Sequence, residues 1–397
     1  MKDKFSNELE NVRMSPIVSI SEEINKISSE FEKSGKPFIK FQRGEIDFPT
    51  PRYIIDAVNE GLEMGLTKYP QSGGENFFKD QILEKLACEN KASGLSRENI
   101  TVTYGGQEAL ELSFKLFKKG AGFSPCWSCV LENFVPFSNI NFKEIPLSDE
   151  FEIDYNLLEK TVKEIDFLYV NTPHNPTGKI FSEEELTKVA EICNKKNVHI
   201  ISDEAYEKIV YDGKKHFSLS SLPLENIISA FTLSKTYSMT GWRLGYAVSR
   251  DTRIAKLLRL GEYSQTAGVV PFLQYAGKKA LENKEESSRV ISKMMDEYQK
   301  RRDLLYIGLS KIEGINVKKP EGAFYMFPNF SKIIPSELKN EKRNLYIYNL
   351  LKENGIGVVY GSCFGKYSSD NVRISFSTTP IPLIEEAISR MKKIFRK

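Results

Sequence analysis

The chain has 397 residues, of which 56 are basic and 53 acidic, so its formal net charge is only +3. The charges are well mixed and no basic block stands out, which argues against a nucleic-acid partner. No run of about 18 apolar residues occurs, so we expect no membrane span, and five scattered cysteines fit reduced thiols in a cytosol. These properties are typical of a cytoplasmic enzyme.

The first hundred residues are expected to form helices separated by turn-rich loops. Apolar residues at helical spacing predict a helix over residues 17–31, and a short strand at 39–41 leads into a loop at 43–51. Two more helices are expected near 51–64 and 75–90. The turn between them contains Tyr69.

From about residue 99, strands and helices alternate. Apolar, β-branched runs predict strands at 99–104, 166–171, 198–202 and 227–233, and helical patterns follow at 109–119 and 182–196. This alternation predicts a mostly parallel sheet covered by helices. Polar groups then gather at the carboxyl ends of the strands, where ligands bind in such sheets.

The last third of the chain is predicted to form a smaller α+β domain. A long helical region is expected from about 263 to 309, then a helix at 344–354, a strand at 372–376 and a closing helix at 381–395. We therefore expect an N-terminal segment (1–45) that packs with the small domain, a large domain (46–290) and a small domain (291–397).

Lys235 and Arg243 are the first candidates for a functional site. Lys235 follows a buried strand and is surrounded by hydroxyl side chains, and Arg243 comes eight residues later. An aldehyde cofactor with a phosphate group needs such a pair, because an amine forms a Schiff base and a guanidinium binds the phosphate. The alternative is a turn lysine with a structural arginine.

Two further groups occupy strand ends. Gly105, Gly106 and Gln107 open a helix directly after a strand, so their free N–H groups can hold a phosphate, although Gly-Gly turns are also common without one. Asp203 ends an apolar strand, where an unpaired carboxylate is costly. A pyridinium N–H is a fitting partner, since it turns the ring into an electron sink; the alternative is a cap on the next turn.

Four other side chains suit a ring-shaped ligand or its substrate. Tyr206 can offer its phenol, and Asn175 lies in a loop held by two prolines and a glycine. Trp127 presents a flat face, and Arg373 can bind a carboxylate through two parallel hydrogen bonds. The alternatives are packing for Tyr206, an Asx-turn for Asn175 and a salt bridge for Arg373.

Cys126 and Cys129 form a C-x-x-C pair that does not predict a metal or redox site. No second C-x-x-C or histidine pair completes a tetrahedral set, and the sequence context is not that of thioredoxin. His174, next to Asn175, is interpreted as structural.

Together these motifs resemble the class I/II pyridoxal-phosphate aminotransferases of fold type I, and their wording is closest to bacterial aspartate aminotransferases. The resemblance runs from about residue 37 to the C-terminus. It rests on Pro-His-Asn-Pro-Thr-Gly (173–178), Ser-Asp-Glu-Ala-Tyr (202–206) and the segment 234–246, in the family's order and spacing. It implies a large domain with a mostly parallel seven-stranded sheet and a smaller α+β domain.

The resemblance also implies a role for each candidate. Lys235 holds pyridoxal 5′-phosphate as a Schiff base and then carries a proton between the substrate Cα and the cofactor. Asp203 pairs with the ring nitrogen. The other implied contacts are Asn175 and Tyr206 at the 3′-oxygen, Trp127 on the ring, Gly105, Gly106, Gln107, Thr232 and Arg243 at the phosphate, and Arg373 with the Gly44 backbone at the substrate carboxylate.

Tyr69 is implied to reach the phosphate in a neighbouring subunit, so the expected assembly is a homodimer with shared active sites. The expected reaction moves an amino group from an L-amino acid, with aspartate first and aromatic or alanine-type donors open, to a 2-oxo acid such as 2-oxoglutarate. A C–S β-lyase or a decarboxylase on the same fold is the alternative. A non-catalytic effector domain of a transcription regulator is disfavoured, because about 40 N-terminal residues leave no room for a helix-turn-helix module.

Overall fold

The computed structural model describes residues 10–33 and 35–396. Its centre is a seven-stranded sheet in which β8 alone runs antiparallel to its neighbours. In spatial order the strands are β2 (Ile100–Thr103), β8 (Gly245–Ser249), β7 (Ile227–Thr232), β6 (His199–Asp203), β5 (Phe167–Asn171), β3 (Lys119–Ser124) and β4 (Asn141–Pro146). The prediction of a mostly parallel sheet is confirmed.

Strands β3, β4 and β8 of this sheet were not predicted from the sequence, and in β3 the glycines explain why. Gly120 and Gly122 lower the strand propensity of the segment. In the fold, however, a Cβ on Gly120 would lie 2.3 Å from the Phe167 ring, and one on Gly122 would lie 2.9 Å from the Phe142 ring. The glycines therefore make room for neighbouring aromatic side chains.

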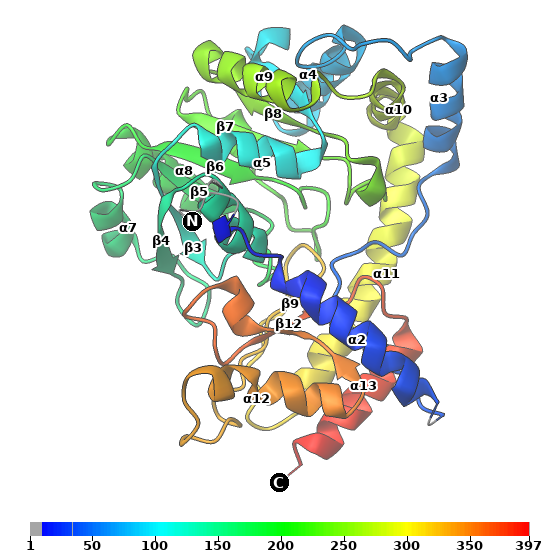
Figure 1. Cartoon of the computed structure of the whole chain (residues 1–397), viewed down its shortest axis with the longest axis vertical. Helices are drawn as coiled ribbons and strands as arrows, with labels where there is room; N and C mark the ends of the chain where they lie inside the picture. Colours follow the sequence, from blue (N-terminus) through cyan, green and yellow to red (C-terminus); the bar gives the residue numbers. More distant parts are fainter. Residues whose placement is uncertain (1–9, 34, 397) are drawn as a thin grey trace, which may run out of the picture.

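Helices cover both faces of the sheet (Figure 1). Along β5, Phe167 and Tyr169 pack toward α5 (Gly105–Lys115) and α9 (Thr252–Thr266), whereas Leu168 and Val170 pack toward α7 (Tyr155–Thr161) and α8 (Glu183–Asn194). This alternation follows from the two-residue period of a strand. A third cluster joins β2 and β8 to α3 (Arg52–Glu63), α4 (Asn76–Glu89) and α10 (Pro271–Glu282).

The helical region predicted from 263 to 309 consists of separate helices. They are α9, which begins earlier, at Thr252, then α10, and finally α11 (Lys284–Ser310). Ala267 ends α9 in a left-handed conformation (φ 58°), and the side chain of Asn283 caps α11 by accepting from the Glu286 N–H. Local capping therefore divides into separate helices a region whose apolar pattern is continuous.

The C-terminal elements share one core with the N-terminal segment. Figure 1 shows α2 lying beside α12 and α13, with α11 running from this part to α10 and α3. A parallel pair joins β1 to β10, and an antiparallel sheet has the order β11-β12-β9. The bounds are α2 (Pro16–Glu32), β1 (Ile39–Lys40), β9 (Tyr325–Met326), α12 (Asn340–Glu353), β10 (Ile356–Gly357), β11 (Val359–Tyr360), β12 (Val372–Ser375) and α13 (Ile381–Ile394).

The domain boundaries at 45/46 and 290/291 stay a prediction. Helix α11 runs without a break through position 290, and residues 1–9 of the predicted N-terminal segment lie outside the described residues. In the part of the chain that is described, no helix is long and apolar enough to cross a membrane.

Candidate active site

A cavity of about 170 Å³ opens at the carboxyl ends of β5, β6 and β7, beside the start of α5. The predicted site residues that line it are Gly106, Gln107, Trp127, Asn175, Asp203, Tyr206, Thr232, Lys235 and Arg243. The strand register explains this convergence, because Asn171 of β5 pairs with Asp203 of β6, and Asp203 pairs with Ala230 of β7. Polar residues far apart in sequence thus meet at one sheet edge.

Asp203 is a buried carboxylate whose hydrogen-bond partners are neutral. The Tyr169 hydroxyl donates to Oδ2 at 2.7 Å, and the Ala205 N–H donates to Oδ1 at 3.2 Å. Burial raises the pKa of Asp203 to about 6, although both hydrogen bonds oppose the rise. The contact with Ala205 is the predicted turn cap. Because the cap leaves the negative charge uncompensated, a cationic ring N–H in the cavity would stabilise it.

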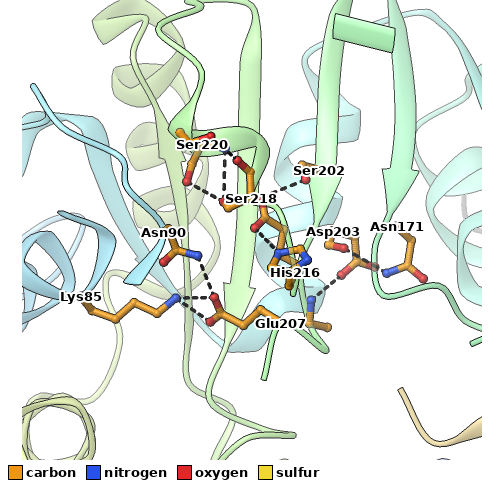
Figure 2. Close-up of polar contacts among 12 residues, drawn as sticks. Lys85, Asn90, Asn171, Ser202, Asp203, Glu207, His216, Ser218 and Ser220 are labelled. Atoms are coloured by element: carbon orange, nitrogen blue, oxygen red, sulfur yellow. Dashed lines mark hydrogen bonds and ion pairs between the residues drawn. The ribbon is translucent and has the colours of Figure 1, made fainter. Parts of the chain in front are cut away.

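Two acidic side chains that do not line the cavity anchor the turn after β6. Figure 2 shows one of them, Glu207, with Lys85 and Asn90. Glu204 accepts from the Ser202 hydroxyl and lies 2.9 Å from His216 Nε2. Glu207 receives Lys85 Nζ at 2.5 and 2.6 Å and Asn90 Nδ2 at 2.9 Å. These buried contacts hold the turn that carries the aspartate and the tyrosine of the cavity.

Lys235 lines the cavity and reaches the N-terminal part of the chain with its amine. Its Nζ donates to the Gly44 carbonyl at 2.8 Å. Burial lowers the pKa of Lys235 to about 8; Glu45 acts in the opposite direction, and the positive charges of Arg243 and Arg373 add to the lowering. Compared with an ordinary lysine, a much larger share of this amine is therefore neutral near physiological pH.

The far end of the cavity combines a helix N-terminus, hydroxyl groups and a cation. The Thr232 and Ser234 hydroxyls are 2.8 Å apart, and Arg243 donates to the Thr240 carbonyl. Arg243 adopts a left-handed conformation (φ 56°), and a Cβ on Gly105 would lie 3.0 Å from its Nη2. The guanidinium thus lies against the first turn of α5, where backbone N–H groups have no partner within the helix. This combination suits a phosphate.

Arg373 is a buried cation whose partners carry no charge. It is 1% exposed and donates from Nη1 to Asn175 Oδ1 at 3.2 Å and from Nη2 to the Gln42 carbonyl at 2.9 Å. The rings of Tyr325 and Phe364 flank the guanidinium at 4.5 and 5.0 Å. The salt-bridge alternative is thus not what the structure shows. The carbonyl bonded to this arginine belongs to Gln42, two residues before the predicted Gly44.

The remaining predicted residues differ in their placement. The Tyr206 hydroxyl lies 2.9 Å from the Tyr325 hydroxyl. Trp127 borders the cavity and packs edge-on against Phe134. Tyr69 is 93% exposed and lines a different hollow, next to the 266–272 segment. One chain therefore does not bring Tyr69 to its own cavity.

Several residues of the site were not found from the sequence. Tyr169 reads as a core strand residue, and only the β5–β6 register places its hydroxyl at Asp203. Asn171, Ser234 and Thr240 also line the cavity. The sequence could have indicated them only by their closeness to predicted residues, since Ser234 directly precedes Lys235 and the other two lie within four residues of Asn175 and Arg243.

His174 and the C-x-x-C cysteines lie near the site without joining it. His174 Nδ1 lies 2.7 Å from the Thr177 hydroxyl, and burial lowers the pKa of His174 to about 3. Cys126 and Cys129 are free thiols, and burial raises the pKa of Cys129 to about 11. Within residues 10–33 and 35–396, no group of histidine, cysteine and acidic side chains is arranged to hold a metal ion.

Comparison with known proteins gives a consistent result. The family model "Aminotransferase class I and II" matches residues 36–391. The chain is 34% identical to the probable aspartate/prephenate aminotransferase of Aquifex aeolicus over 99% of each sequence, and 34% identical to the aspartate aminotransferase of Pyrococcus abyssi over 91% of this chain and 92% of the relative.

Solved structures are similar over nearly the whole chain. The aspartate aminotransferase from Thermus thermophilus with maleate superimposes with a TM-score of 0.89 at 28% identity and covers 99% of this chain and 100% of that one. The aromatic aminotransferase from Pyrococcus horikoshii gives a TM-score of 0.83 at 32% identity, over 92% of this chain and 98% of that one.

Proposed function

This chain belongs to the class I and II aminotransferase family, and we propose that it uses pyridoxal 5′-phosphate to move an amino group from aspartate to a 2-oxo acid such as 2-oxoglutarate. One observation carries the proposal. A single cavity presents a lysine of lowered pKa, a buried carboxylate with neutral partners and an anion cradle. These groups match an aldehyde, a ring nitrogen and a phosphate.

The residues present fit this cofactor. Asp203 would pair with the ring nitrogen, Tyr206 and Asn175 would contact the ring oxygen, and Trp127 would cover one ring face. The first turn of α5 (Gly105, Gly106 and Gln107), Thr232, Ser234 and Arg243 would hold the phosphate. When bound, pyridoxal phosphate supplies an electron sink for the bonds at the substrate Cα.

The chain's own groups would orient the substrate and move the proton. Arg373 would bind the substrate α-carboxylate, because its buried guanidinium has no charged partner among the described residues and Asn175 and Gln42 hold it in place. Lys235 would take the proton from the substrate Cα and return it, since its pKa of about 8 allows both forms of the amine near neutral pH. The Gly44 carbonyl would help to hold that amine.

The choice of aspartate rests on what the related proteins act on. Those reported above include aspartate aminotransferases from two organisms, one of them solved with maleate, and maleate resembles a four-carbon dicarboxylate substrate. An aromatic donor is the second choice, in line with the Pyrococcus horikoshii enzyme.

We also propose that the chain forms a homodimer with shared active sites. Large apolar side chains are exposed at Leu62 (44%) and Met64 (61%), a few residues before Tyr69 in the chain, and at Tyr263 (57%), just before the 266–272 segment that shares a hollow with Tyr69. Exposed apolar surface of this kind is typical of protein interfaces. In such a dimer Tyr69 would reach the phosphate cradle of the partner subunit. We further propose the division into residues 1–45, 46–290 and 291–397. The packing of α2 and β1 into the C-terminal core supports the assignment of the N-terminal segment to the small domain.

The test is to load the purified protein with pyridoxal phosphate, record its visible absorbance and add single amino acids. Conversion of the bound cofactor to its amine form by aspartate, and its return with 2-oxoglutarate, is the expected result. Lys235→Ala is the control, because it should prevent covalent retention of the cofactor after borohydride reduction. Release of pyruvate from cysteine without amine-form cofactor would instead identify a lyase.

A further inference from the structure

Tyr325 lies between two parts of the proposed site that are far apart in sequence. It belongs to β9, is 2% exposed, and pairs with Ser375 of β12, two residues after Arg373. This register places its ring beside the arginine, 4.5 Å from the guanidinium carbon. The centre of the Phe364 ring lies 5.0 Å from the same guanidinium carbon.

The hydroxyl of Tyr325 serves a different neighbour. It lies 2.9 Å from the hydroxyl of Tyr206, and the two rings meet nearly at right angles, with centroids 5.7 Å apart. A Cβ on Gly44 would lie 2.1 Å from the Tyr325 oxygen. The missing side chain of Gly44 therefore leaves the space that the Tyr325 hydroxyl occupies. The carbonyl of the same glycine accepts the hydrogen bond from Lys235.

We propose that Tyr325 is a positioning residue of the active site, which sets the donor direction of Tyr206 through its hydroxyl and the place of Arg373 through its ring. The Tyr325 O–H donates to the Tyr206 oxygen, so the Tyr206 O–H is left to donate into the cavity. This inference rests on the proposed binding of pyridoxal phosphate, whose ring oxygen would accept from Tyr206.

The position of the Arg373 cation favours Tyr325 as the donor of the pair. Its guanidinium carbon lies 4.5 Å from the centre of the Tyr325 ring, and this positive charge works against the rise that burial causes in the pKa of Tyr325. A cation beside a phenol makes its hydroxyl a better hydrogen-bond donor, whereas Tyr206 is the phenol that lines the cavity. A donor that itself receives a hydrogen bond is polarised, so Tyr206 becomes a better donor toward the cavity.

The decisive variant is Tyr325→Phe, which keeps the ring beside Arg373 and removes only the hydroxyl. The visible absorbance of the loaded protein is titrated against pH. Because a weaker donor at the ring oxygen leaves more negative charge there, the cofactor should hold its titrating proton more tightly. The apparent pKa of the titration should then rise by about half a unit to one unit.

The affinity for maleate, measured by calorimetry on the same samples, tests the contact between the Tyr325 ring and Arg373. It should stay within about twofold of wild type in Tyr325→Phe and weaken about tenfold in Tyr325→Leu, which removes the aromatic contact with Arg373. Tyr298→Phe is the matched control. Tyr298 is a buried tyrosine of the same core, and its hydroxyl has no side-chain hydrogen-bond partner among the described residues.

A double variant distinguishes an effect of Tyr325 that acts through Tyr206 from a general loss of structure. In Tyr206→Phe/Tyr325→Phe the titration should match that of Tyr206→Phe alone, because the proposed effect of Tyr325 acts through Tyr206. A Tyr325→Phe titration shifted no further than that of Tyr298→Phe would overturn the inference, as would additive shifts in the double variant. If wild type itself binds no pyridoxal phosphate, the proposed function fails instead.

Discussion

The buried pair of Lys85 and Glu207 offers the sharpest test of how the site is supported. The two side chains are only 4% and 9% exposed, and Lys85 Nζ lies 2.5 Å from the carboxylate. The lysine also lies 4.4 Å from the centre of the Phe231 ring. It thus links α4 and β7 to the turn that carries Tyr206, and we choose Lys85→Met as the perturbation.

The variant leaves a carboxylate buried without its main partner. Removing one member of a buried pair typically costs about 3–5 kcal/mol of unfolding free energy. We expect a value near 3 kcal/mol, because Asn90 continues to donate to Glu207 at 2.9 Å. The affinity for pyridoxal phosphate should fall as well, since Tyr206 adjoins Glu207 in the turn.

Removing Lys85 should reverse the direction in which folding shifts the pKa of Glu207. In wild type, burial would raise the pKa of Glu207, but Lys85, Lys208 and the Asn90 hydrogen bond outweigh it and the pKa is lowered. The pair therefore contributes stability above the unfolded pKa of about 4.3, and that contribution is lost as pH falls through the folded pKa. Without Lys85 burial should dominate and raise the folded pKa, so the deficit of Lys85→Met should shrink as the solution is acidified.

The assay is urea unfolding followed by circular dichroism at one fixed protein concentration, because association would make stability concentration-dependent. Lys85→Met/Glu207→Gln should recover most of the loss, since it leaves no buried charge and keeps an acceptor for Asn90. Lys208→Met is the control: its pair with Glu89 is 31% and 27% exposed, so about 1 kcal/mol or less is expected. A Lys85→Met deficit no larger than that of Lys208→Met would refute the reasoning, as would a double variant no more stable than the single one.

Other predictions address the cavity directly. Burial lowers the pKa of Lys235 to about 8, so association of pyridoxal phosphate with cofactor-free protein, followed by stopped-flow absorbance, should accelerate as pH rises through that value; Lys235→Ala should lose this dependence. Arg373→Leu should weaken maleate binding about 100-fold by calorimetry, because it removes the buried cation that receives the carboxylate. Inactive Tyr69→Ala and Lys235→Ala dimers, mixed in equal amounts and reassembled, should regain activity. About half of the dimers are then mixed and each has one intact site of two, so about a quarter of all sites should be restored. No recovery of activity would contradict a shared site.

The alternation of strands and helices could be derived from the sequence because it depends on local periodicity. So could the polar residues at strand ends: Lys235, Asp203 and Asn175 each follow an apolar strand, and parallel topology brings such ends together. The family motifs added roles that local pattern alone left open.

What the sequence did not show depends on contacts between distant segments. Gly120 and Gly122 weaken the pattern of β3, and only the rings of Phe167 and Phe142 packed over them explain why a strand forms there. Tyr169 looks like a core residue until the β5–β6 register brings it to the carboxylate.

Tertiary structure also decided how Arg373 is held. Its partners Gln42 and Tyr325 come from other parts of the chain, and neither has a local feature that marks it as functional. The residue types and their order along the chain were determined by the sequence alone. Which hydroxyl, carbonyl and ring meet each charge was decided by strand register and by the packing of the C-terminal core against the sheet, because these contacts join residues that no local period relates.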